Sequence, residues 1–390
     1  MHKTVGWGRR MLFATLDYIK NSYIAFWVVM LAISVYGWLL IYSANYRWGS
    51  VQRTIYTQAI AILLGLIAAV FISLIDYERL GELWWLVGGF CVVLMIVTII
   101  FGQGATGASS VSENRAWLKI AGVSFQSAEL LKIGFIVTFS YHLAHVTKQN
   151  MINNIREVIL LIVHMFVPIV LNLLTLEYGN PFMLIFVCII LFISSGINWK
   201  YIMAGILSIL VAVPLLWNFM AEYQKDRFRA VFNPMPGDEL DILYQQTQGK
   251  IAMGGGKLLG QGFLKGTMVQ NGLVPECSND FIFTVAGEEF GFIGCMVVII
   301  LLVALMIMCV KTALEARDDM GRFICMGFFA TIAVQTIFNV GMCLMILPVI
   351  GVTLPFFSAG GSSSMCLYFG FGLVLSVYMR RGESKMKIAY

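Results

Sequence analysis

Long runs without a charged residue constrain this chain more than any other feature of its sequence. Phe90–Phe101 and Cys295–Val310 are two of them, and the whole chain is 59% hydrophobic and only 12% charged. An ordinary soluble domain carries about 25% charged residues. Closed outer-membrane barrels alternate polar and apolar residues along each strand, and these runs do not alternate. The sequence therefore predicts an all-α integral membrane protein, and it excludes a secreted enzyme, a disulfide scaffold and a disordered chain.

The apolar runs predict ten transmembrane helices, because a helix needs about 20 residues to cross the hydrocarbon core of a bilayer. We expect them at 22–43, 55–75, 82–101, 127–146, 156–175, 181–198, 200–219, 281–310, 321–348 and 362–379. An even number places both termini on one side. Most Lys and Arg residues outside the spans fall on that side, which indicates cytoplasmic N- and C-termini. The prediction is a single polytopic domain, 1–390, with a long extracytoplasmic loop at 220–280 between helices 7 and 8.

The charge and the cysteine content give no indication of a nucleic-acid partner or of a metal site. The formal net charge of +5 fits flanking charges on membrane segments better than a nucleic-acid surface. The eight cysteines show no paired ligand spacing, and we interpret them as small core- or lipid-facing residues. His142 and His145 have a spacing that suits a metal pair, but no third ligand is evident. The sequence predicts no metal site and no cofactor, while a requirement for a divalent cation stays open.

Charged residues inside apolar spans are candidate functional groups, because a charge in lipid costs several kcal/mol unless it is paired or hydrated. Glu129 and Lys132 are three residues apart, so they share one helix face and can neutralise each other. They form either a structural salt bridge or the lining of a cavity for a phosphate-bearing ligand, and we favour the cavity. Glu288 and Glu289 are expected to make buried hydrogen bonds between helices.

Asp280 is the candidate catalytic residue. It stands at the outer lip of the eighth predicted span, close to both solvent and bilayer. Partial desolvation at such a position raises the pKa of a carboxyl group toward the range that suits a general base.

Two glycine-containing segments on the outer side are also candidates for ligand contact. Residues 254–262 resemble a phosphate-binding loop but lack Ser or Thr after the lysine, so we expect at most backbone donors near an anionic head group. Residues 347–364 contain prolines, glycines and serines and cannot form one continuous helix. At membrane depth, irregular backbone is tolerated only where it is buried or lines a cavity, so we expect a re-entrant or cavity-lining turn here.

Several short motifs occur together along nearly the whole chain. They are Tyr42-Ser43-Ala44, Gln126-Ser127-Ala128-Glu129 followed by Lys132, Tyr244-Gln245 with Gln248, Gly260-Gln261-Gly262, Pro275-Glu276 leading to Asp280-Phe281-Ile282-Phe283 and Glu288-Glu289, and Leu354-Pro355-Phe356 with Gly360-Gly361-Ser362-Ser363. In this combination they resemble the SEDS family (shape, elongation, division and sporulation) of bacterial cell-wall polymerases, and its RodA-like members more than its FtsW-like members. The usual Gln-Pro-Ser-Glu and Asp-Leu-Gly-Thr patterns of the family are altered here at 126–129 and 177–180.

The resemblance implies a peptidoglycan glycosyltransferase that polymerises lipid II on the outer face of the bacterial cytoplasmic membrane, in cell elongation, by an inverting transfer. Asp280 would act as general base. The implied substrate-binding residues are Glu129, Lys132, Arg115, Lys119, Gln248, Glu276, Ser362 and Ser363. The implied partner is a class B penicillin-binding protein, which supplies transpeptidation.

Other functions stay open on the sequence. A flippase for lipid-linked precursors, or another transporter, is equally compatible with many spans and intramembrane charges. A non-catalytic scaffold for the penicillin-binding protein is a further alternative. A polymerase of division or sporulation remains an alternative to one of elongation.

Overall fold

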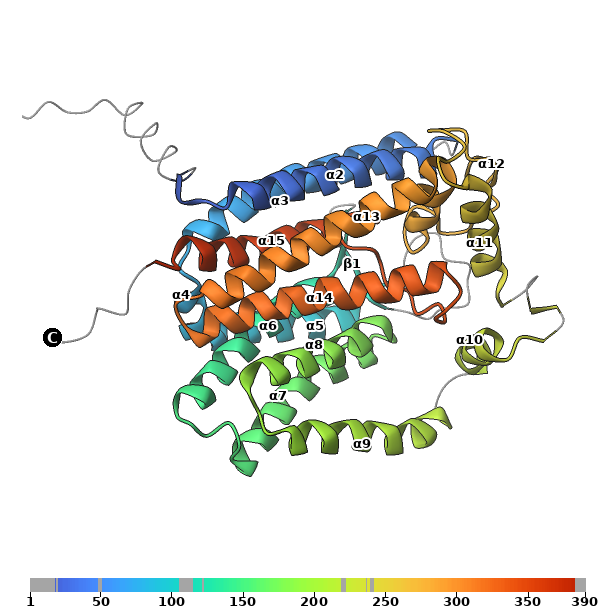
Figure 1. Cartoon of the computed structure of the whole chain (residues 1–390). Coiled ribbons are helices and arrows are strands. Elements are labelled where there is room, and N and C mark those ends of the chain that lie inside the picture. The colour runs from blue at the N-terminus through green and yellow to red at the C-terminus, as the bar shows by residue number, and fades with distance from the viewer. Residues whose placement is uncertain are drawn as a thin grey trace, which may run out of the picture.

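The apolar runs form helices that lie side by side (Figure 1). The computed structural model describes residues 18, 20–47, 51–104, 115–120, 123–218, 222–235, 237–238 and 242–382. Its long apolar helices are α2 (Ile24–Asn45), α3 (Val51–Leu74), α5 (Trp84–Phe101), α6 (Ser127–Lys148), α7 (Ile155–Leu174), α8 (Gly179–Ser195), α9 (Trp199–Trp217), α13 (Ile282–Glu315), α14 (Asp319–Cys343) and α15 (Gly361–Met379). The shorter elements are α4 (Tyr77–Glu82), α10 (Glu222–Phe232), α11 (Tyr244–Gly256), α12 (Thr267–Gln270), β1 (Trp117–Ile120) and β2 (Val123–Gln126).

Eight helices among the described residues are long and apolar enough to cross a membrane, namely α2, α3, α5, α6, α7, α13, α14 and α15. Helix α8 is apolar but has only 17 residues. The chain is therefore a multi-pass helical membrane protein, as the sequence predicts, and crossing by all ten predicted spans stays a prediction.

The predicted span 321–348 is wrong at its end, because α14 stops at Cys343. Met345 has a left-handed φ of 61°. The backbone N–H groups of Ile346 and Leu347 both bond to the carbonyl of Gly341. This tight turn ends the helix although the sequence remains apolar.

Helices α6, α14 and α15 form the most buried layer of the bundle. Helix α14 packs against α13, α8 and α6, and α15 packs against α3 and α14. Large aromatic side chains such as Phe139, Phe323 and Phe371 fill the space between these helices. The outer helices α3, α5 and α7 keep apolar side chains exposed, which suits contact with lipid.

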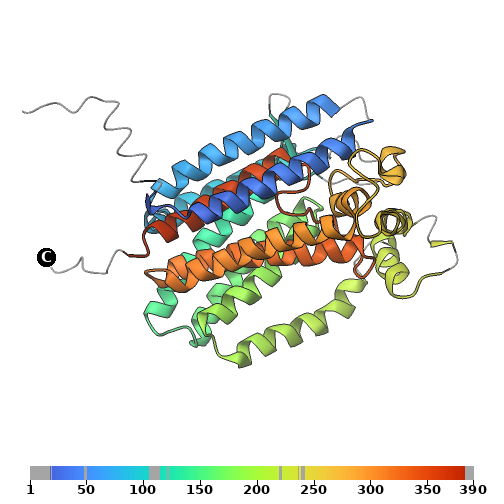
Figure 2. The ribbon, with the colours of Figure 1, turned by 45° about the horizontal axis from the view of Figure 1, so that its top comes forward.

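The two ends of the bundle differ. Helices α10, α11 and α12 gather at one end, whereas α2 begins and α15 ends at the opposite end (Figures 1 and 2). The predicted loop 220–280 thus contains three helices, and α11 packs against α13. Strands β1 and β2 form an antiparallel hairpin with Trp117 opposite Gln126, and the hairpin leads directly into α6.

Helix α13 is interrupted at Gly291, where φ is 67° and ψ is −161°. Only glycine adopts this conformation readily. A Cβ atom at Gly291 would also lie 2.4 Å from the backbone nitrogen of Gly260. Beyond the break, the N–H groups of Phe292 and Ile293 bond to the carbonyls of Lys257 and Leu258. The break therefore joins the end of α11 to α13.

Candidate active site

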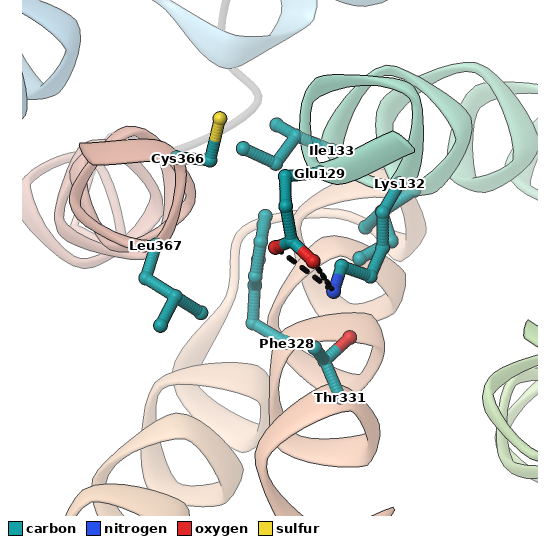
Figure 3. A pocket seen from close by; sticks show the side chains of 8 residues that line it. Glu129, Lys132, Ile133, Phe328, Thr331, Cys366 and Leu367 are labelled. Carbon is teal, nitrogen blue, oxygen red and sulfur yellow. Dashed lines mark hydrogen bonds and ion pairs between the residues drawn. The ribbon is translucent and has the colours of Figure 1, made fainter. Parts of the chain in front are cut away.

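Glu129 and Lys132 form the buried centre of the candidate site. Both lie in the first turns of α6, and the Lys132 Nζ atom is 3.1 Å from each carboxylate oxygen of Glu129. The pair borders a small cavity between α6, α14 and α15, and the two side chains point toward each other there (Figure 3). The other lining residues are Ile133, Ile136, Phe328, Thr331, Cys366 and Leu367. The geometry confirms the predicted pairing, while a role in ligand binding remains a prediction.

Two serines in the first turn of α15 attach this pair to the neighbouring elements. The Ser363 hydroxyl donates to Glu129 Oε2 at 3.4 Å. The backbone N–H of Gln126 donates to the Ser362 hydroxyl at 3.3 Å. The predicted residues Ser362 and Ser363 therefore lie beside Glu129, as part of one polar group.

Glu177 belongs to the same group, although the sequence singled it out only as a departure from a family pattern. Its Oε1 atom accepts hydrogen bonds from Gln126 Nε2 and Asn180 Nδ2, both at 2.7 Å. Burial, together with the charge of Glu129, raises the pKa of Glu177 to about 7, although the charge of Lys132 and the hydrogen bonds from Asn180 and Gln126 oppose the rise. Glu177 is 51 residues from Gln126 in the chain, so no local pattern pointed to this contact.

The predicted residues Arg115 and Lys119 lie near this group with exposed side chains. The backbone N–H of Arg115 donates to the carbonyl of Thr175, two residues before Glu177. Lys119 lies on β1 opposite Ser124. Neither side chain is held against the Glu129–Lys132 pair by a hydrogen bond or ion pair within the described residues.

Asp280 lies immediately before α13, at the end of the bundle that carries α10 to α12. Its backbone carbonyl accepts a hydrogen bond of 2.8 Å from the buried Asn339 side chain of α14. Its side chain is half-buried and has no hydrogen bond or ion pair within the part of the chain that the structure describes. A Cβ atom on Gly351 would lie 3.8 Å from Asp280 Oδ2, so the residue at 351 leaves the carboxylate room.

The charge environment of Asp280 suits a base. Burial, together with the charge of Glu276, raises the pKa of Asp280 to about 6, although the charge of Arg227 opposes the rise. Glu276 is exposed and has a left-handed φ of 51°, and its carbonyl accepts the N–H groups of Asn279 and Phe281. Arg227 of α10 also donates to the carbonyl of Val349 at 3.3 Å. The sequence missed Arg227, because its contacts are to distant parts of the chain.

The residues 358–363, here called the bridging segment, connect Asp280 and its neighbours to the Glu129–Lys132 pair. At its start, the Ser358 hydroxyl donates to the carbonyl of Asn279 at 2.7 Å. The N–H of Ala359 donates to the carbonyl of Ser278 at 2.8 Å. At its end lie the serines that contact Gln126 and Glu129. The irregular backbone predicted between the last two spans thus ends at Gly360, and with the first turn of α15 it lies between two polar groups.

Glu288 and Glu289 make structural hydrogen bonds, whereas the side chain of Gln248 makes none among the described residues. Glu288 accepts the N–H groups of Met268 and Val269, at 2.7 and 2.9 Å, and Glu289 accepts a hydrogen bond from Ser43. Both therefore make the buried interhelical bonds that the sequence predicts. Gln248 is half-buried on α11, and its side chain has no hydrogen bond within the described ranges.

The interpretation of residues 254–262 as donors to an anion is not supported. The N–H groups of Gln261 and Gly262 bond to the carbonyls of Glu288 and Glu289, and that of Gly260 bonds to Gly256. These donors are therefore already occupied by protein. His142 pairs with His164, at 3.2 Å between their Nδ1 atoms, rather than with His145.

Comparisons with known proteins identify the family and the fold of the chain. The sequence profile of the FtsW/RodA/SpoVE family, described as a family of cell cycle proteins, matches residues 23–383. The chain belongs to this family. The peptidoglycan glycosyltransferase MrdB of Escherichia coli K12 is 30% identical over 356 residues, which cover 91% of this chain and 92% of MrdB.

Two solved structures show the same fold as this member of the FtsW/RodA/SpoVE family. A chain from a peptidoglycan synthase complex, whose report concerns coordination of polymerization and crosslinking, matches with a TM-score of 0.77 at 23% identity, over 93% of this chain and 99% of that chain. The rod shape determining protein RodA of Thermus thermophilus matches with a TM-score of 0.68 at 23% identity, over 93% of this chain and 98% of RodA. The bundle described above is therefore a RodA-like fold.

Proposed function

We propose that this protein is a peptidoglycan glycosyltransferase that polymerises lipid II into glycan strands on the outer face of the cytoplasmic membrane. The family membership and the activity in the name of MrdB support the reaction class. The observation that carries the chemistry is the bridging segment, which connects the turn that carries the half-buried Asp280 to the buried Glu129–Lys132 ion pair. A role in cell elongation is the form that we favour, because RodA is among the proteins with this fold.

The proposed mechanism is a single inverting displacement. Asp280 takes the proton from the 4-hydroxyl of the acceptor sugar while that oxygen forms a bond to the anomeric carbon of the donor. The bond from that carbon to the diphosphate breaks, and the electron pair leaves with the diphosphate. Lys132 stabilises this developing negative charge and Glu129 positions Lys132, which is the kind of preorganised electrostatic stabilisation that lowers a barrier most.

The remaining predicted contacts complete the substrate site in this proposal. Arg115 and Lys119 approach the lipid-linked diphosphate from solvent, and Ser362 and Ser363 contact it from the bridging segment. Glu276 and Gln248 lie on the acceptor side. The exposed position of Arg115 and Lys119 supports a role in capture of substrate rather than in chemistry.

The membrane arrangement in this proposal has ten spans in one domain, cytoplasmic N- and C-termini, and an extracytoplasmic segment 220–280 between helices 7 and 8. The gathering of α10 to α12 at the end opposite to the start of α2 and the end of α15 supports it. We further propose a class B penicillin-binding protein as partner. The similarity to a chain from a peptidoglycan synthase complex supports a partner of this kind.

A polymerisation assay with Asp280→Asn tests the function. We expect the native protein, alone or with its partner, to convert purified lipid II into glycan polymer on a gel, and Asp280→Asn to lower the rate by about 10²–10⁴-fold, because the general base is lost. Asp319→Asn, at the exposed start of α14, is the matched control and should polymerise normally. Native-like polymer from Asp280→Asn would contradict the assignment of the base.

The flippase alternative has its own outcome in the same preparation. Movement of fluorescent lipid II across liposome membranes, without polymer at any condition, would contradict the polymerase and support a transporter. Normal wall synthesis in cells that carry only Asp280→Asn would instead support a scaffold.

A further inference from the structure

Glu177 lies on the turn between α7 and α8, beside the Glu129–Lys132 pair, and the mechanism above does not use it. Its Oε1 atom accepts two hydrogen bonds of 2.7 Å, from Gln126 and Asn180. Its Oε2 atom is buried and has no hydrogen-bond partner among the described residues. The hydrogen bonds to this carboxyl group therefore reach one oxygen only.

This environment favours the protonated acid. Ionised carboxylates that are buried cost much free energy unless they are paired and fully hydrogen-bonded. The two donors to Glu177 are neutral amides, and Lys132 is already paired with Glu129 at 3.1 Å. An ionised Glu177 would place two carboxylates around one ammonium group. The pKa of about 7 follows from this burial and from the charge of Glu129.

The charged and titratable groups around Glu177 come from each element packed against it. Glu129 and Lys132 face it from α6 and act on its charge. Arg115 approaches through its backbone bond to Thr175, but its guanidinium side chain is exposed. Tyr178, the next residue in the turn, is also exposed. The three groups Glu129, Lys132 and Glu177 therefore have a net charge of zero when Glu177 is protonated and of −1 when it is ionised.

We propose that Glu177 is a positioning residue of the polymerase site. Gln126 and Asn180 hold its protonated side chain, which keeps the Glu129–Lys132 pocket electrically neutral. When Glu177 loses this proton, its negative charge repels the anionic diphosphate of the substrate from the pocket. Repulsion between like charges is strong where water is excluded, so an ionised Glu177 weakens substrate binding through Lys132. The proposal rests on the proposed function, because it assigns a diphosphate to this pocket.

The two carboxyl groups affect the pH dependence of kcat/KM in opposite directions. Asp280 must be ionised to act as base, so kcat/KM rises as pH increases through about 6. Glu177 must be protonated, so KM rises and kcat/KM falls as pH increases through about 7. The native protein should therefore show a bell-shaped profile, in which the falling limb belongs to Glu177.

Steady-state kinetics of Glu177→Gln test the proposal. The glutamine side chain keeps an oxygen acceptor for Gln126 and Asn180 and is always neutral. With purified full-length protein and lipid II between pH 5 and 9, native KM should approach a rise of about tenfold per pH unit above pH 7, as one ionisation requires. In Glu177→Gln, KM should match the native value at pH 6 and stay flat, while the rising limb from Asp280 remains.

Two further variants keep the result decisive. Glu82→Gln, at an exposed carboxylate of α4, should keep the full native profile. Asn180→Ala removes a donor that favours the ionised form of Glu177, so its falling limb should move to higher pH, and this test stands even if Glu177→Gln does not fold. The proposal would be overturned if kcat/KM of folded Glu177→Gln fell with pH as in the native protein. It would also be overturned if kcat/KM of Asn180→Ala fell at the same pH as in the native protein. Absence of polymer from the native protein at every pH would instead count against the proposed function.

Discussion

A buried ion pair such as Glu129–Lys132 contributes little net stability, because removing two charges from water costs about as much as their attraction returns. Apolar side chains of similar size would serve packing between α6, α14 and α15 at least as well. The presence of the pair beside a cavity is therefore consistent with the anion-binding role that we propose for it.

We expect the double variant Glu129→Gln/Lys132→Met to separate these two roles. Lys132→Met alone leaves a buried carboxylate without its partner and should destabilise the protein by about 3–5 kcal/mol. In detergent, the double variant should have a melting temperature near that of the native protein. It should nevertheless polymerise lipid II at least about 10²-fold more slowly, because the cation is missing. Thermal unfolding and the gel assay measure the two effects. Native activity in the double variant would remove Lys132 from the mechanism.

The residues that could be predicted from the sequence and those that could not differ in how far their contact partners lie from them along the chain. Glu129 and Lys132 were predicted as a pair because helix geometry alone brings residues at this spacing together. Glu177 and Arg227 were missed because their contacts connect elements that only the fold brings together. A single sequence carries no signal for such contacts.

At the scale of elements, apolar runs predict where helices form but not how they end or break. Helix α14 stops early because Met345 turns left-handed within an apolar stretch. Helix α13 breaks at Gly291 inside a predicted continuous span. The three helices of the 220–280 region were also missed, because their sequences are polar and lack long apolar runs. The break in α13 is held by the segment after α11, whereas the turn after α14 is held by bonds to Gly341 of the same helix.

We expect Gly291→Ala to destabilise the protein by about 1–3 kcal/mol, because alanine is strained at this φ and ψ. The added Cβ atom also meets the backbone at Gly260. Gly89→Ala in α5 is the control: a Cβ atom there meets nothing within 4 Å, and alanine favours helix. The melting temperatures of the two variants, measured by thermal unfolding, compare the two substitutions. Equal melting temperatures for the two variants would show that the break in α13 is not required.

At the scale of the whole molecule, the bundle has two chemically distinct ends. One end holds α10 to α12, Asp280 and Arg227. The opposite end holds an ionic group in which Arg317 of the α13–α14 connection lies 3.0 Å from Asp76 and 3.1 Å from Glu78. The proposed reaction requires the first end to face outward, which fixes the orientation of all the helices at once.

Cysteine labelling in intact cells tests this orientation. The exposed Lys265 lies beyond α11, and the exposed Arg79 lies on α4 at the other end. We expect Lys265→Cys to react with a membrane-impermeant maleimide in intact cells, and Arg79→Cys to react only after permeabilisation. The native chain is the blank, since seven of its eight cysteines are buried and Cys295 is partly buried. The reverse pattern would place Asp280 on the cytoplasmic side and exclude the proposed reaction.

The bridging segment has a consequence for inhibition. Its first residues are anchored to the turn that carries Asp280, and its last residues are anchored to Glu129 and Gln126. In the proposed mechanism, a small molecule that displaced this segment would therefore move the proton acceptor and the leaving-group cation together.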